Sequence, residues 1–302
     1  MKRRQPLYLC GPTAVGKSAV AIELARRLKG EIISVDSMQV YHGMDIGTAK
    51  PSIAEREGVP HFLIDVADLN ETFDAARFVH LANDADTEIQ SRGNLPIYCG
   101  GTGLYFNALL QGLGEAPASD PQLRAELEST PLAALVEELR EKDPKVFEQI
   151  DRSNPRRVIR AIEVIRLTGK PFSEQRASRK QIDARIVGLE MEREPLNQRI
   201  DRRVDEMFRR GLMDETRALL SRGLRENRTA CQALGYKQVV EHFDGEHTLS
   251  ETVELVKLRT RQFAKRQMTW FKRQLPVQWL RVEAKETASG IADRLIDIYK
   301  LV

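Results

Sequence analysis

The chain has 302 residues, of which 41% are hydrophobic, 30% charged and 6% aromatic, as in globular proteins of about two domains. No apolar run approaches the ~18–20 residues of a membrane helix, and Leu7–Cys10 is too short for the hydrophobic part of a signal peptide. The three cysteines, Cys10, Cys99 and Cys231, lie far apart and leave one unpaired in any scheme, which argues against a disulfide framework or a zinc site. We therefore expect a cytoplasmic protein without a membrane segment.

The net charge of +3 arises from 47 basic and 44 acidic residues, so its distribution is more informative than its sum. Residues 152–180 contain nine Lys or Arg and two Glu, and residues 257–273 contain seven Lys or Arg and no acid. A local basic excess suits a polyanion such as RNA, because each neutralised phosphate releases condensed counterions. On charge alone, two solvated helix faces explain the pattern equally well.

The N-terminal third alternates short apolar runs with amphipathic segments. Helices are predicted at Ala19–Leu28, with Gly30 as a stop, and at Asp74–Ser91; strands are predicted at Leu7–Cys10, Glu31–Val35, His61–Val66 and Leu95–Cys99. Buried strands alternating with helices indicate an α/β fold with a P-loop and a doubly wound parallel sheet. Ligands of such sheets bind beyond the carboxyl ends of the strands, so residues 11–18, Asp36 and residues 100–103 should converge.

The pattern changes after Gly114. Four helices are predicted, each with a proline near its start: Pro121–Leu127, Pro131–Glu141, Pro144–Ile150 and Pro155–Leu167. A strand follows at Arg185–Glu190, and the remainder, Leu196–Tyr299, is predicted to be mostly helical. The simplest organisation is a core of residues 1–114 and 185–302 with a helical insertion domain at 115–184.

A phosphate-binding loop follows the first strand. Gly11, Pro12, Thr13, Ala14, Val15, Gly16, Lys17 and Ser18 match G-x-x-x-x-G-K-[ST] between a strand and a helix. Backbone amides and the helix N-terminus would bind phosphate oxygens, Lys17 would add a positive charge, and the Ser18 hydroxyl would bind Mg²⁺. Such a loop predicts nucleotide binding, usually of ATP, but a diphosphate fits it equally well. We find no Walker B carboxylate of the kind that a nucleoside triphosphatase needs.

Polar residues also follow the second and fourth strands. Asp36 would stand beside the phosphate loop if the second strand is adjacent to the first, and could take a proton from an acceptor. A Mg²⁺ ligand or a helix cap is the alternative. Ser37 and Gln39 could contact a base edge, and glutamine is suited to adenine. The turn Gly100, Gly101, Thr102 and Gly103 permits close backbone approach to a ligand, although a purely structural turn has the same composition.

Seven segments together resemble the bacterial tRNA dimethylallyltransferase family. They extend from residue 11 to residue 273 in the family's order: GPTAVGKS at 11–18, DSMQVYHGMDIGTAKP at 36–51, GGTGLY at 100–105, RRVIRAIEV at 156–164, RIDRRVDEMFRRGL at 199–212, ALGYKQ at 233–238 and TRQFAKRQMTWFKR at 260–273. The resemblance implies transfer of a dimethylallyl group from its diphosphate to N6 of adenosine 37, 3′ to the anticodon of tRNA. The phosphate loop, Lys17 and a Mg²⁺ at Ser18 would then hold the leaving diphosphate.

The same resemblance assigns roles on the acceptor side. Asp36 would accept the proton of the exocyclic amine, a poor nucleophile whose lone pair is delocalised into the ring. Thr102 would lie near the reacting groups, holding Asp36 or a bridging diphosphate oxygen, and Thr13 would line the same pocket. The target base must leave its stack to react, and Ser37, Met38 and Gln39 lie where it would enter.

Basic residues would hold the tRNA anticodon stem-loop. The candidates are Arg124, Arg156, Arg157 and Arg160 in the insertion, and Arg261, Gln262, Lys265 and Arg266 near the C-terminus. Phe263 and Trp270 are predicted to be packing residues, with stacking on RNA bases as the alternative. The sequence departs from the family pattern at Ser153–Arg156 and at Cys231–Gly235, both at positions of expected RNA contact. No Cys/His cluster like the C-terminal zinc finger of eukaryotic relatives is present, and nothing suggests more than a monomer.

Two other functions explain part of these features. A nucleotide or small-metabolite kinase would use ATP in the phosphate loop and Asp36 to activate a hydroxyl, but leaves the basic stretch 257–273 without a role. A non-catalytic RNA-binding module would use the loop only to sense nucleotide, and it predicts that Asp36→Ala leaves all activity intact.

Overall fold

The structure is a computed structural model that describes residues 4–114, 116–175 and 182–300. Residues 115 and 176–181, which belong to the predicted insertion and to the end of the basic stretch 152–180, lie outside the described residues. The chain forms two compact units, a core unit of Met1–Leu110 with Ile182–Val302 and a helical unit of Gln111–Gln181.

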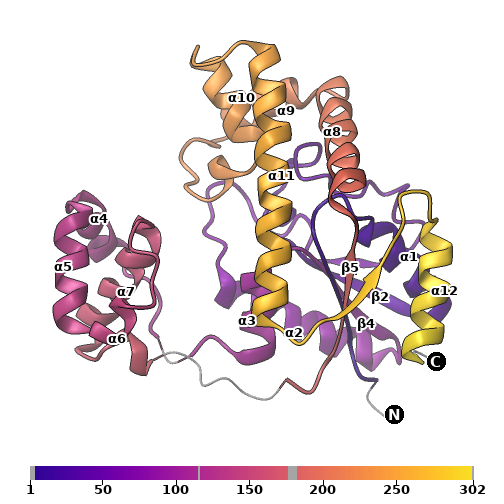
Figure 1. The fold of residues 1–302 in the computed structure, drawn as a ribbon, viewed down its shortest axis with the longest axis horizontal. Helices are drawn as coiled ribbons and strands as arrows, with labels where there is room; N and C mark the ends of the chain where they lie inside the picture. Colours follow the sequence, from indigo (N-terminus) through magenta and orange to yellow (C-terminus); the bar gives the residue numbers. More distant parts are fainter. Residues whose placement is uncertain (1–3, 115, 176–181, 301–302) are drawn as a thin grey trace. The chain divides into compact units, whose positions relative to one another are not determined.

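A parallel sheet forms the centre of the core unit (Figure 1). Its strands are β1 (Leu7–Cys10), β2 (Gly30–Val35), β3 (His61–Phe62), β4 (Leu95–Gly100), β5 (Arg185–Glu190) and β6 (Gln278–Arg281). All pairs are parallel, and the order in the sheet is β3-β2-β4-β1-β5-β6. The predicted α/β fold with a parallel sheet is confirmed.

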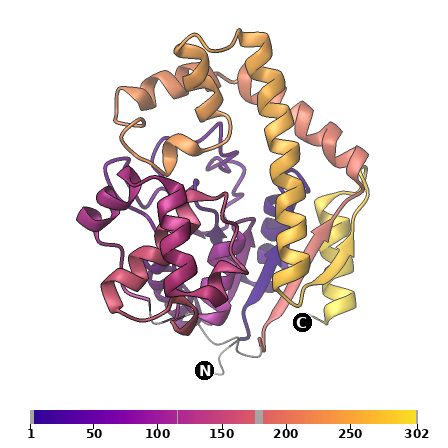
Figure 2. The same cartoon turned by 60° about the vertical axis from the view of Figure 1, so that its left-hand side comes forward.

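Helices cover both faces of this sheet. The helices of the core unit are α1 (Lys17–Leu28), α2 (Ala75–Ser91), α3 (Gly103–Gln111), α8 (Arg193–Arg209), α9 (Leu212–Leu220), α10 (Tyr236–Phe243), α11 (Leu249–Gln274) and α12 (Ala288–Tyr299). Because successive strand residues point to opposite faces, Leu9 and Ile97 pack with α1, α8 and α12, whereas Cys10 and Tyr98 belong to the cluster of α2 and α3. Figure 2 shows the long α11 rising beside the sheet towards α10.

The strand order corrects one expectation about the site. Strand β4 lies between β1 and β2, so the second strand is not adjacent to the first. The register nevertheless aligns the three carboxyl ends, because Gly100 is paired with both Val35 and Cys10. The phosphate loop, Asp36 and the second glycine turn therefore leave the sheet at one level, as predicted.

One strand prediction was wrong. The strand predicted at His61–Val66 ends at Phe62, because Leu63 and Asp65 have positive φ angles of 61° and 54° that are incompatible with an extended strand. The region predicted to be mostly helical is so, and it also contains β6, a four-residue edge strand that pairs with β5. In addition, Gly30 begins β2, and the left-handed Lys29 ends α1 instead.

The helical unit has its own apolar core. Its elements are α4 (Pro121–Ser129), α5 (Leu132–Lys142), α6 (Pro144–Phe147), α7 (Pro155–Thr168) and the 3₁₀ helix η1 (Phe172–Glu174). Buried Leu127, Leu139 and Ile162 pack together within it. Asp120, Asp143 and Asn154 cap α4, α6 and α7 directly before a proline, as the predicted helix starts require. Within the described ranges, no helix is both long and apolar enough to cross a membrane.

Candidate active site

The phosphate loop connects β1 to α1 in a strongly curled conformation. Gly11, Ala14 and Gly16 have φ angles of 145°, 64° and 106°. Such left-handed positions make successive amide groups face a common side, and the N-terminus of α1 adds to the positive potential there. A Cβ atom at Gly11 would lie 2.6 Å from the carbonyl oxygen of Leu189 in β5, so this position requires glycine. The loop thus has the geometry of an anion site.

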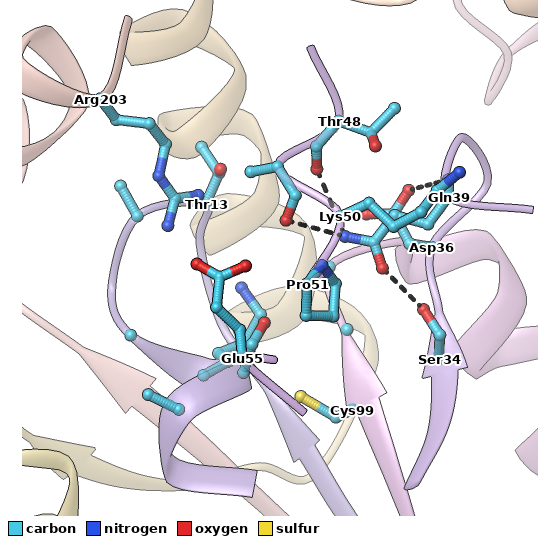
Figure 3. Close-up of a pocket in the computed structure, with 18 of the residues that line it drawn as sticks. Thr13, Ser34, Asp36, Gln39, Thr48, Lys50, Pro51, Glu55, Cys99 and Arg203 are labelled. Atoms are coloured by element: carbon cyan, nitrogen blue, oxygen red, sulfur yellow. Dashed lines mark hydrogen bonds between the residues drawn. The ribbon is translucent and has the colours of Figure 1, made fainter. Parts of the chain in front are cut away.

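A cavity of about 640 Å³ opens beside this loop (Figure 3). Of the predicted site residues, its lining includes Thr13, Ala14, Gly16, Lys17, Ser18, Asp36 and Gln39. Gly100 and Gly101 of the second glycine turn contribute as well, together with apolar side chains of Ile22, Ile46, Met207 and Phe263. Among the described residues, Gly11, Pro12, Val15, Ser37, Met38 and Thr102 do not belong to the lining. Phe263 was predicted to be a packing residue; in the structure its side chain lines this cavity.

Lys17 provides a cation at the base of the cavity. Its Nζ donates a hydrogen bond of 2.7 Å to the carbonyl oxygen of Pro12. Burial lowers the pKa of the Lys17 ammonium to about 8; nearby Arg203 lowers this pKa as well, whereas Cys99 and Asp36 counteract the shift. A bound anion would stabilise the charged form and reverse this shift.

Arg203 is a second cation that the sequence analysis missed. It extends from α8 into the cavity close to Thr13, with Glu55 opposite (Figure 3). Burial and the nearby Arg199 lower the pKa of the Arg203 guanidinium, and Glu55 partly offsets them. Within the described part of the chain, this guanidinium forms neither a hydrogen bond nor an ion pair within 4 Å. Arg203 lies within residues 199–212, one of the segments that resemble the family. The helix there contains several arginines, and their spacing fits a solvent-exposed face equally well, so the sequence did not single out Arg203.

Asp36 faces the same cavity from the end of β2. Its Oδ1 accepts hydrogen bonds from the backbone amides of Met38 and Gln39, at 2.8 and 3.2 Å. Its Oδ2 has no hydrogen-bond partner among the described residues. The carboxylate therefore caps the turn with one oxygen and keeps the other available, so the capping interpretation and the catalytic one are compatible.

Thr102 lies beside Asp36 without contacting it. Its Oγ1 accepts a hydrogen bond of 3.1 Å from the amide of Ser37, and its own amide donates to the carbonyl oxygen of Val35. The threonine thus holds the residues on either side of the carboxylate, and its hydroxyl proton can still be donated.

The Gln39 amide is already used inside the protein. Its Oε1 accepts a hydrogen bond from the Ser34 hydroxyl, and its Nε2 donates to the carbonyl oxygens of Thr48 and Ala49. Reading an adenine edge would require exchange of these bonds. The amide instead holds the segment that carries Lys50, whose buried ammonium contacts Asp45 and Asp65.

The basic residues of α11 differ in their surroundings. Arg261 pairs with both carboxylate oxygens of Asp201 in α8, at 2.9 and 2.8 Å. Gln262 accepts a hydrogen bond from Arg259, and Arg266 lies over the ring of Phe263. Lys265 is exposed. The Trp270 ring packs against Gly103, where a Cβ atom would lie 2.3 Å from it, in line with its predicted packing role.

In the helical unit, two predicted RNA-binding arginines share a buried carboxylate. Arg124 and Arg160 both donate to Oε2 of Glu163, at 3.2 and 2.7 Å, and the Glu163 side chain has no exposed surface. Arg156 and Arg157 are exposed in the first turn of α7. Arg124 also pairs with Glu128 at 3.7 Å, so the two arginines are matched by two carboxylates and their side chains are held in place.

Comparisons with known proteins agree with this geometry. The family model described as IPP transferase matches residues 39–274. A tRNA dimethylallyltransferase of Shouchella clausii is 47% identical over 299 residues, covering 96% of each chain, and that of Geobacillus thermodenitrificans is 48% identical, covering 90% of this chain and 89% of its own. The crystal structure of the tRNA isopentenylpyrophosphate transferase of Bacillus halodurans aligns with a TM-score of 0.73 at 43% identity, over 99% of this chain and 97% of that one. A eukaryotic dimethylallyltransferase acting on tRNA aligns with a TM-score of 0.79 at 30% identity, over 98% of this chain and 79% of its own. The resemblance found in the sequence is confirmed, and this chain belongs to the IPP transferase family.

Proposed function

We propose that this chain transfers the dimethylallyl group of dimethylallyl diphosphate to N6 of adenosine 37 in tRNA, releasing diphosphate. The observation that carries the proposal is the composition of one cavity: Lys17 and Arg203 are cations suited to a diphosphate, and Asp36 supplies a carboxylate oxygen that has no hydrogen-bond partner in the described part of the chain. Family membership and the names of the relatives support the same reaction.

The donor half of the cavity suits a short prenyl diphosphate. Lys17, Arg203 and the phosphate-loop amides would bind the diphosphate and stabilise its growing charge as the bond between C1 and the bridging oxygen breaks. Ile22, Ile46, Met207 and Phe263 offer an apolar wall for the dimethylallyl chain. Gly11, Pro12 and Val15 contribute through the shape of the loop.

The phosphate loop also fits Mg²⁺. The Ser18 side chain is exposed on the first turn of α1 and lines the cavity, so its hydroxyl would hold the ion together with diphosphate oxygens and water. Among the described residues, no group of three or more His, Cys, Asp or Glu side chains is placed to hold a metal by itself. When bound, Mg²⁺ would neutralise part of the charge of the leaving diphosphate.

The acceptor half depends on Asp36. As N6 forms its bond to C1, the amine proton moves to the free Oδ2 of Asp36, and the electron pair of the breaking bond leaves with the diphosphate. Thr102 fixes Ser37 and thereby the carboxylate, and its hydroxyl proton is available to the leaving oxygen. Ser37, Met38 and Gln39 form the turn that the flipped adenine would meet.

We assign tRNA binding to basic residues of both units. Lys265 and Arg266 of α11 lie on the core unit with Arg261 and Gln262, and the helical unit, predicted as the insertion 115–184, contributes Arg124, Arg156, Arg157 and Arg160. We further propose that the chain acts as a monomer and, because its substrate would be tRNA, in the cytoplasm.

Replacement of an exposed arginine of α7 tests the assigned RNA surface. We expect Arg157→Gln to weaken tRNA binding and to reduce the slope of log K against log salt by about one, because one phosphate contact is lost. The control is Arg140→Gln, an exposed arginine of α5 in the same unit that pairs with Glu137. An unchanged salt slope in Arg157→Gln would remove α7 from the RNA interface.

The pH dependence tests the role of Lys17. The donor binds the charged ammonium, so kcat/KM for dimethylallyl diphosphate should be constant below pH 8 and fall as the pH rises through the Lys17 pKa of about 8. One unit above this pKa the loss is about tenfold, since kcat/KM reports the free enzyme. Bound diphosphate raises the same pKa, so kcat should stay constant to higher pH. If kcat and kcat/KM fell at the same alkaline pH, this role of Lys17 would be contradicted.

A single incubation tests the reaction itself. The chain is mixed with radiolabelled dimethylallyl diphosphate and unmodified tRNA, with excess ATP in a parallel sample, and the tRNA is digested to nucleosides. We expect label in N6-isopentenyladenosine at position 37 only. Transfer of the γ-phosphate of ATP without prenylation would favour the kinase, and retention of tRNA binding without either reaction would favour the binding module.

A further inference from the structure

Gln267 joins the two glycine turns of the core unit. Its Oε1 accepts a hydrogen bond of 2.8 Å from the amide of Thr13 in the phosphate loop. Its Nε2 donates a hydrogen bond of 2.9 Å to the carbonyl oxygen of Gly101 in the second turn. The side chain comes from α11 and is only 8% exposed; its bond to Gly101 is buried and its bond to Thr13 is partly buried. One amide group thus spans the donor side and the acceptor side of the cavity.

The second turn is shaped around this side chain. A Cβ atom at Gly101 would lie 2.3 Å from Nε2 of Gln267, and one at Gly103 would lie 2.3 Å from the ring of Trp270, one turn further along α11. Both glycines are therefore needed for α11 to approach. The helix holds the turn at two points that flank Thr102.

The bridge continues to the carboxylate through Thr102. The Thr102 amide donates to Val35 and its Oγ1 accepts from Ser37, and these two residues flank Asp36. A connected path of hydrogen bonds therefore links the loop that carries Lys17 to the turn that carries Asp36. At the loop end, the Thr13 amide is already satisfied by Gln267, so the diphosphate must be bound by the amides that follow it.

We propose that Gln267 is a positioning residue that sets the separation between the bound diphosphate and the Asp36 carboxylate. The inference rests on the proposed function. An amide is required because one end of the bridge must accept and the other must donate. Its loss should reduce the rate of the chemical step more than the affinity for the donor, because the cations that bind the diphosphate remain. A misplacement of about 1 Å is enough for a ~100-fold loss of rate.

The test compares Gln267→Met with Gln274→Met, the same change at the exposed last residue of α11. Gln267→Met keeps the length of the side chain and removes both hydrogen bonds. In single turnover with saturating donor and tRNA, we expect a loss of about 100-fold in Gln267→Met and wild-type rates in Gln274→Met. The dissociation constant of dimethylallyl diphosphate, measured without tRNA, should stay close to the wild-type value.

A double variant separates positioning from general destabilisation. If Gln267 acts through Asp36, the change to Met should have little further effect once Asp36→Asn has removed the base, so the two losses are far from additive. Additive losses, an unchanged single-turnover rate, or a donor affinity that falls by the same factor as the rate would each overturn the inference. Failure of the proposed function is distinguishable, because the wild-type chain itself would then form no isopentenyladenosine.

Discussion

Asp36→Asn is expected to lower the single-turnover rate of prenyl transfer by about 10²–10⁴-fold, the usual contribution of a general base. Asparagine can still accept the hydrogen bonds from the amides of Met38 and Gln39, so the turn should be preserved. It cannot take the proton of the adenine amine. The affinity for tRNA and for the donor should therefore remain close to wild type, as measured by filter binding and by equilibrium titration.

This substitution also separates the alternatives for Asp36. If the carboxylate served only as a cap, Asp36→Asn would retain full activity. If it served as a Mg²⁺ ligand, high Mg²⁺ would restore the rate. Asp84→Asn, an exposed carboxylate on α2, is the matched control and should be silent. Either full activity or rescue by Mg²⁺ would exclude the role as a base.

Arg203→Gln is expected to reduce kcat/KM for dimethylallyl diphosphate by about 10²–10³-fold, the effect of removing one donor that stabilises developing charge. Arg203 lines the cavity without an ion pair among the described residues, and burial lowers the pKa of its guanidinium, so the expected effect follows if it binds the diphosphate as proposed. Arg202→Gln changes the adjacent, exposed arginine of α8 and should leave kcat/KM unchanged.

The same variant should not lose stability. A half-buried charge without an ion pair within 4 Å among the described residues contributes little to folding, so replacing it with a neutral amide should leave the Tm equal or raise it. Thermal unfolding followed by circular dichroism measures this directly. A lower Tm together with a small loss of activity would mean that Arg203 supports the fold and does not bind the diphosphate.

The placement of residues from distant segments depends on long-range pairing. The sequence placed Asp36 near the phosphate loop by assuming that two consecutive strands are neighbours, yet β4 separates them. Asp36 and the phosphate loop nevertheless leave the same edge of the sheet, because parallel strands in register end at one edge whatever their order. Strand order itself results from the packing of the whole sheet, which no local pattern records.

The direction of polar side chains on amphipathic helices is equally hard to predict from sequence. Gln267 and Arg203 lie in segments that resemble the family, but polar residues spaced every three or four positions are expected both on a face exposed to solvent and on a face that binds a ligand. Only the packing of α8 and α11 against the sheet turns these two residues towards the cavity. Conversely, Gln39 had the chemistry to read adenine, and the fold uses its amide to hold Thr48 and Ala49.

Several features could be predicted from the amino-acid sequence: the phosphate loop, the buried strands β1, β2, β4 and β5, the helical segment after Gly114, and the family. These features depend on local patterns: left-handed glycines, apolar runs that only a buried strand explains, and prolines at helix starts. Three facts became visible only in the folded chain: Arg203 and Gln267 face the cavity, Arg124 and Arg160 share Glu163, and one oxygen of Asp36 has no hydrogen-bond partner among residues 4–114, 116–175 and 182–300. The physical reason is that these facts concern which groups remain unpaired after folding, and pairing is a property of the packed chain.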